Sequence, residues 1–242
     1  MVEAGIWGLV GGVSLVLGAA LGLAVSFSQR TIGVIMAFGA GVLISALSFD
    51  LADEAFQLGG RDAFAGGLAA GALAFFLADS ALAKRGGQDR KRSGGQQGDN
   101  AAMGLVLGAV LDGIPESVAI GVTLLEGDGV GVAVVVAVFL SNVPESLSAA
   151  TGLRAAGMRP SRILGLWLVV MAVSGLAAAV GYATLDGAAP DIVGFIQAFA
   201  AGAVLTMLAD TMMPEAFEHG GRVVGLMTVL GFALAFLLSN AG

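Results

Sequence analysis

The chain contains eight apolar stretches, each about as long as a membrane crossing requires. A helix of about 20 apolar residues spans the hydrocarbon core of a bilayer. Of the 242 residues, 57% are hydrophobic and only 12% are charged, whereas a soluble domain carries about 25% charged residues. The sequence therefore predicts an all-α integral membrane protein with eight transmembrane helices in a single domain, residues 1–242. The predicted helices cover residues 5–27, 31–58, 63–83, 101–125, 130–153, 161–184, 190–217 and 222–240.

The basic residues are distributed unevenly between the loops. Ten of the 11 Lys and Arg residues fall in alternate loops, and only Arg61 lies on the opposite side. Loops rich in Lys and Arg remain in the cytoplasm. We therefore expect a multi-pass protein of the plasma or inner membrane with both termini outside. The stretch 84–100, rich in Gly, Gln and charge, is predicted to be a flexible cytoplasmic loop.

One short motif occurs twice, 29 positions apart, inside the fourth and fifth apolar stretches. The first copy is Leu111–Ser117 and the second is Leu140–Ser146, and each contains a Pro-Glu pair. A carboxylate at the centre of a membrane helix costs roughly 2.5–3.5 kcal/mol, so such residues usually have a function. The neighbouring proline removes a backbone donor and leaves a carbonyl oxygen free. Both features are typical of a cation site within the membrane.

Four side chains of these motifs are candidate metal ligands. Asp112 and Glu116 are four residues apart and share one helix face, and Asn142 and Glu145 are three apart and share another. If the two helices pack together, their oxygens suit a divalent cation. With no cysteine and one histidine, a thiolate or multi-histidine site within the chain is excluded. The alternative is that these groups pair structurally with serines, which are Ser117, Ser141 and Ser146.

A longer repeat relates the second and seventh apolar stretches. Residues 38–60 align without gaps on residues 199–221, with nine of 23 positions identical. With the predicted orientation the two copies run in opposite directions, which makes the repeat inverted. Inverted repeats around a site at the membrane midplane are typical of secondary transporters. The predicted arrangement is three helices, a central pair and three further helices (3+2+3).

Further acidic residues lie near the ends of the repeated helices. We interpret the first group as an entrance on the outer side and the second as an exit relay on the inner side. Ordinary interfacial residues at helix ends are the alternative. The predicted pathway residues are Asp50, Asp53 and Glu54 outside, and Asp210, Glu215 and His219 inside.

At these motifs the chain resembles the ZIP family of divalent metal transporters in its bacterial form. The resemblance covers nearly the whole chain and rests on Asp112–Val122, Ser141–Leu147 and Phe199–Gly221. It implies a transporter rather than an enzyme, with Zn, Mn, Fe or Cd as its substrate and no organic cofactor. It also implies elevator-type movement of helices 1, 4, 5 and 6. The expected partners are the ion and the lipid bilayer, with a homodimer as an open alternative, and no nucleic acid is expected.

The chain departs from the family pattern at three positions. Asp112 replaces the usual histidine, Gly113 replaces an asparagine ligand, and the helix-6 glutamate is absent from Ser174–Ala179. The resemblance therefore implies one metal ion rather than two. A site made only of oxygen ligands favours harder ions such as Mn²⁺ or Mg²⁺.

Two other functions compete with transport into the cell. A ZIP-like protein that has altered or lost transport, acting as a sensor or scaffold, is favoured by the missing ligands. A cation/proton exchanger also uses Pro-Glu motifs in inverted repeats, but there the two motifs belong to separate halves of the chain, which a spacing of 29 residues does not favour.

Overall fold

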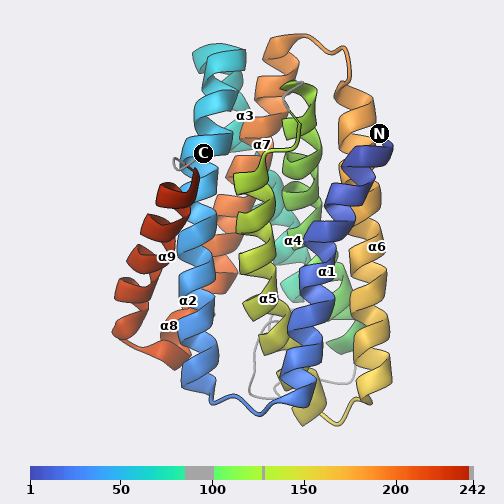
Figure 1. Cartoon of the computed structure of the whole chain (residues 1–242), viewed down its shortest axis with the longest axis vertical. Coiled ribbons are helices and arrows are strands. Elements are labelled where there is room, and N and C mark those ends of the chain that lie inside the picture. The colour runs from blue at the N-terminus through green and yellow to red at the C-terminus, as the bar shows by residue number, and fades with distance from the viewer. Residues whose placement is uncertain (85–100, 127–128, 240–242) are drawn as a thin grey trace.

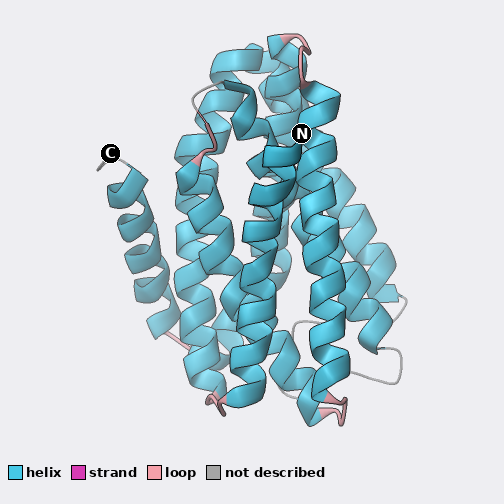
Figure 2. Ribbon diagram, turned by 45° about the vertical axis from the view of Figure 1, so that its right-hand side comes forward, coloured by secondary structure: helices cyan, strands magenta, loops and turns pink. Residues whose placement is uncertain are grey.

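The structure is a computed structural model that describes residues 1–84, 101–126 and 129–239, and every element in these ranges is a helix (Figures 1 and 2). The all-α prediction is therefore confirmed. The predicted loop 84–100 lies outside the described residues apart from Lys84. The elements are α1 (Val2–Ala24), α2 (Gln29–Ala46), the π-helix η1 (Leu47–Ala52), α3 (Asp53–Leu82), α4 (Ala101–Thr123), the 3₁₀-helix η3 (Leu124–Glu126), α5 (Val132–Ala155), α6 (Pro160–Leu185), α7 (Pro190–Met207), the π-helix η4 (Leu208–Met212), α8 (Met213–Gly220) and α9 (Val223–Ser239).

Five helical stretches within the described residues are long and apolar enough to cross a membrane. One of them, Gln29–Leu82, has 54 residues, more than twice what a bilayer needs. It turns at Gly60, where φ is 66° and ψ is −172°. These stretches confirm a multi-pass membrane protein, while the eight-helix 3+2+3 arrangement remains a prediction. The five stretches are Val2–Ala24, Gln29–Leu82, Val132–Ala155, Pro160–Leu185 and Pro190–Gly220.

The two copies of the long repeat have the same local structure. A π-helix begins at Leu47 in the first copy and at the aligned Leu208 in the second. Each copy ends at a glycine with positive φ, 66° at Gly60 and 65° at Gly221. Glycine adopts this conformation readily because glycine has no Cβ atom. The sequence repeat is therefore also a structural repeat.

The two repeats pack by exchanging helices. α3, which begins in the first copy, packs along α7 of the second, and α9, which directly follows the second copy, packs along α2 of the first. A Cβ atom on Gly71 of α3 would overlap the carbonyl oxygen of Phe199, and a Cβ on Gly231 of α9 would overlap that of the aligned Phe38. α2 and α7 run in opposite directions (Figure 1). This is the packing that an inverted repeat produces.

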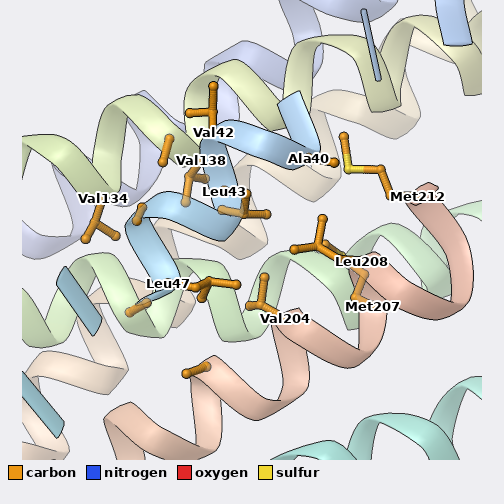
Figure 3. Packing of buried hydrophobic residues seen from close by; sticks show 14 of the residues in the cluster. Ala40, Val42, Leu43, Leu47, Val134, Val138, Val204, Met207, Leu208 and Met212 are labelled. Carbon is orange, nitrogen blue, oxygen red and sulfur yellow. The ribbon is translucent and has the colours of Figure 1, made fainter. Parts of the chain in front are cut away.

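The remaining helices form a second packing unit. α1 packs against α5 and α6, and α4 packs against α6, around a small core that includes Leu15, Leu153 and Trp167. The larger core joins α5 to α2, α7 and η4, where Val138, Leu43 and Leu208 meet (Figure 3). The bundle therefore consists of one unit of α1, α4, α5 and α6, and another of α2, α3, α7, α8 and α9.

Candidate metal site

The two Pro-Glu motifs lie inside α4 and α5, where each proline interrupts the hydrogen bonding of its helix. Pro115 lies within α4 and Pro144 within α5. Neither can donate to the carbonyl four residues earlier, at Leu111 and Leu140 respectively. Each glutamate follows directly after its proline, so each carboxylate lies beside a turn with spare backbone acceptors.

All four candidate ligands are buried. Asp112 and Glu116 are each 2% exposed, and Asn142 and Glu145 are each 4% exposed. Burying a charge is costly unless it is compensated by other groups or by a metal. Three buried acidic side chains on two neighbouring helices therefore require compensating partners or a cation.

Two of the three serines proposed as structural partners bond to the backbone instead. The Ser141 hydroxyl donates to the Val138 carbonyl at 3.0 Å, and the Ser146 hydroxyl donates to the Asn142 carbonyl at 2.8 Å. A hydroxyl carries a single proton to donate. These bonds leave the oxygens of Ser141 and Ser146 as acceptors, which weakens the explanation that they neutralise the acidic side chains.

The candidate ligands lie on adjacent helices without forming a compact acidic cluster. α4 and α5 are in contact, and the Asn142 side-chain nitrogen lies 3.5 Å from the Gly11 carbonyl of α1, to which it donates. Among the described residues, no group of three or more His, Cys, Asp or Glu side chains is placed so as to hold a metal ion. Convergence of all four ligands on one ion therefore stays a prediction.

The resemblance to the family implies two further ligand positions, Gly113 of α4 and Ala178 of α6, and these two helices pack together. A Cβ atom on Gly113 would lie 3.5 Å from the Ser174 hydroxyl oxygen. By the resemblance, Ala178 stands where the family pattern has its helix-6 glutamate, and it is completely buried. A Cβ on Gly8 of α1 would lie 2.6 Å from the Ala178 Cβ, and a Cβ on Gly121 would overlap the Ala178 carbonyl oxygen. A glutamate at 178 therefore has no room in this packing.

A cavity of about 640 Å³ lies at the end of the bundle where α4 ends and α5 begins. Asp50 and Glu54 both line it, as do the hydroxyl residues Ser45 and Thr123. The Glu54 atom Oε1 is buried and accepts no hydrogen bond from the described residues. Asp50 accepts a hydrogen bond from the Ser239 hydroxyl of α9 at 3.0 Å.

The other predicted pathway residues are placed differently. Asp53 is exposed and accepts a hydrogen bond from Gln57 of its own helix at 2.7 Å. At the opposite end, His219 Nε2 donates to Glu215 Oε1 at 3.1 Å, and Glu215 is buried. Asp210 lies on η4 and is exposed. Of the six predicted pathway residues, the structure thus gathers Asp50 and Glu54 around a cavity and pairs Glu215 with His219.

Sequence reasoning missed several polar residues around these sites. Ser45, Thr123 and Ser239 line the same cavity as Asp50 and Glu54, but single hydroxyl residues are common in apolar helices and gave no signal. Gln197 of α7 is fully buried, and its amide atoms have no hydrogen-bond partner among the described residues. A lone glutamine within an apolar stretch could have identified Gln197 as a candidate functional residue, because a buried amide costs free energy unless it is hydrogen-bonded.

Comparison with known proteins shows the family of the chain. No curated protein matches it. The model of the ZIP zinc transporter family matches residues 78–239, a range that contains α4, α5, both Pro-Glu motifs and the second copy of the long repeat. This match covers well over half of the 242 residues. The chain therefore belongs to the ZIP family, whose members move divalent metal ions across membranes.

Proposed function

We propose that this chain carries one divalent metal ion at a time from outside the cell to the cytoplasm, binding it with Asp112, Glu116, Asn142 and Glu145. The observation that supports this assignment is the burial of three carboxylates and an amide on the two helices that contain prolines. Carboxylate and amide oxygens are ligands that divalent cations accept. The Ser141 and Ser146 hydroxyls donate to backbone carbonyls.

The cation supplies the charge that draws the ligands together. Two like charges 4 Å apart repel by about 4 kcal/mol at an effective dielectric constant of 20. Bringing three carboxylates together at one site therefore requires a cation to compensate their charges. Asp112 in place of histidine makes the ligand set all oxygen, which raises the preference for Mn²⁺ relative to Zn²⁺.

The protein is proposed to lie in the plasma membrane with eight helices in the 3+2+3 arrangement. The ion then crosses between the two packing units. The cavity lined by Asp50 and Glu54 is the entrance, because it collects acidic groups at the end of the bundle where α5 begins. The ion leaves at the opposite end, past Asp210 and the Glu215–His219 pair. Acidic groups along a route raise the local concentration of cations.

Movement of one packing unit against the other would expose the site to each side in turn. α1, α4, α5 and α6 pack mainly with one another, and the exchanged pairs α3–α7 and α2–α9 tie the other unit together. α5 meets α2 where Pro144 lies against Gly39, and a Cβ on Gly39 would be 3.1 Å from Pro144 Cγ. Such a smooth contact between a glycine and a proline ring suits sliding.

The site assignment predicts the order in which ions are transported. In proteoliposomes containing the purified protein, we expect uptake of Mn²⁺ to exceed that of Zn²⁺, with Fe²⁺ and Cd²⁺ measured alongside. The variant Asp112→His should reverse the Mn²⁺/Zn²⁺ order, because an imidazole nitrogen favours zinc. Absence of uptake for every ion by a folded protein would favour a sensor or scaffold, which the packing of Ala178 also allows. An unchanged ion order would remove Asp112 from the site.

The movement is tested by cross-linking, because the chain has no native cysteine. A Cβ on Gly39 would lie 3.2 Å from the Ser141 Cα across the α2–α5 contact. We expect a disulfide between Gly39→Cys and Ser141→Cys to abolish uptake, and reduction to restore it. The matched pair Gly5→Cys and Ala179→Cys joins α1 to α6 within one unit, where the two Cβ atoms would be 3.4 Å apart. Full uptake with the first pair oxidised would contradict the movement.

A further inference from the structure

A second cavity, of about 510 Å³, opens on the flank of the bundle between α4, α6 and α7. It is separate from the polar cavity at the end of the bundle and shares no lining residue with it. We refer to it as the flank pocket. The residues that matter for its chemistry are Pro115 and Val118 of α4, Ala177 and Thr184 of α6, and Phe199 and Ala200 of α7.

The lining of the flank pocket offers nothing to a polar ligand. Among the described residues that form it, Thr184 is the one with a polar side chain. The Thr184 hydroxyl already bonds to its own helix, 2.8 Å from the Val180 carbonyl and 3.1 Å from the Gly181 carbonyl. Apolar cavities of this kind exclude water and take up apolar molecules. The volume falls within the range of ligand pockets, about 300–1,000 Å³.

The mouth of the pocket faces the surrounding membrane. Leu176, Val180 and Ile114 line it and are 64%, 50% and 42% exposed. α6, which carries two of them, is one of the helices long and apolar enough to span a bilayer. Large exposed apolar side chains on such a helix lie in hydrocarbon, so the pocket opens toward the acyl chains of the bilayer.

The internal repeat offers a comparison for the flank pocket. The corresponding contact in the other half of the bundle, between α5 and α2, is closed. In α5, Pro144 lies directly against Gly39 of α2. The matching proline of α4 is Pro115, and the residue of α7 that aligns with Gly39 is Ala200. Pro115 and Ala200 both line the flank pocket. If the flank pocket stayed empty, its lining would lack the dispersion contacts that Pro144 and Gly39 make between α5 and α2.

We propose that an acyl chain of a membrane lipid occupies the flank pocket, where it lies against Pro115 of the Pro-Glu motif in α4. A flexible hydrocarbon chain can enter a concave space between three helices, whereas a helix with its side chains is about 10–12 Å wide. A second copy of this chain would therefore cover the mouth and leave the void unfilled. The binding rests on membrane insertion alone and does not depend on the proposed transport.

The proposal is tested with a phosphatidylcholine that carries a photoactivatable diazirine near the end of one acyl chain. The purified full chain is placed in liposomes of this lipid, irradiated, and its labelled residues are mapped by mass spectrometry. We expect labelling of Val118 and Ala200, although Ala200 is only 1% exposed. Labelling of the exposed Val169 reports the lipids that surround any membrane protein.

A variant whose new side chain fills the flank pocket provides the matched comparison with the parent protein. We expect Ala177→Trp to lower labelling of Val118 and Ala200 at least tenfold while Val169 is labelled as before. Leu168→Trp adds the same side chain at an exposed position of α6 and should change nothing. Ala177→Leu serves as a milder filling variant if Ala177→Trp does not fold.

Three results would overturn the proposal. The first is labelling confined to exposed residues such as Val169. The second is labelling of Val118 and Ala200 that persists at full strength in a folded filled variant. The third is a disulfide between two copies of a Leu176→Cys variant in membranes together with an unlabelled pocket, which would make a second copy the occupant. Metal uptake enters none of these readouts, so a failed transport assay leaves the result unaffected.

Discussion

Replacing Glu116 by glutamine is expected to abolish metal transport while leaving the protein folded. Glutamine keeps the size of the side chain and one acceptor oxygen but removes the negative charge. Removing one partner of a buried charge pair costs about 3–5 kcal/mol, which corresponds to a loss of roughly 10²–10⁴-fold in affinity for the ion. Without metal the variant should be at least as stable as the parent, because an uncharged group is cheaper to bury than a carboxylate.

This prediction is checked by two measurements on the same protein. Uptake into proteoliposomes reports transport, and the rise in Tm on adding metal reports binding. A ligand at 100 times its Kd stabilises a protein by about 2.7 kcal/mol, so loss of affinity should remove that rise. Glu3→Gln is the matched control, since Glu3 is an exposed carboxylate in the first turn of α1. A metal-dependent Tm rise that is unchanged in Glu116→Gln would exclude this glutamate as a ligand.

The helices were predictable because a membrane leaves the chain few options. Backbone groups in hydrocarbon must be satisfied within the segment, so each long apolar stretch has to be a helix. The glycines at which the repeats end, Gly60 and Gly221, were visible as aligned Gly-Gly pairs. The π-helices at Leu47 and Leu208 were not, since they change hydrogen bonding without changing the apolar pattern.

The site was predictable only as a set of residues. Asp112, Glu116, Asn142 and Glu145 stand out because charged or amide side chains are rare in apolar helices, and the structure does bury all four. Which faces of α4 and α5 meet is a different question. Lipid tails are as apolar as a protein interior, so apolar periodicity does not distinguish the two. The distances between the four ligands therefore could not be predicted from spacing.

The glycine contacts between exchanged helices give the largest expected effect on stability. Gly231 of α9 lies so close to α2 that a Cβ atom would overlap the Phe38 carbonyl oxygen. The clash is with backbone, which cannot rotate away as a side chain can, so the two helices must separate. Overpacking a well-packed site typically costs about 1–3 kcal/mol, and we expect Gly231→Ala to lie at or above the upper end of that range.

A second glycine in the same helix provides the control. Gly225 has nothing within 4 Å of its would-be Cβ atom, and alanine is favoured over glycine in a helix by about 0.8–1.0 kcal/mol. Unfolding in detergent should therefore show opposite signs: Gly231→Ala loses stability and Gly225→Ala keeps or gains it. Gly71→Ala should match Gly231→Ala, because Gly71 makes the equivalent contact with Phe199 in the other half of the repeat. Equal stability of Gly231→Ala and Gly225→Ala would mean that α9 does not pack on α2 in this way, and the exchanged arrangement of the repeats would have to be abandoned.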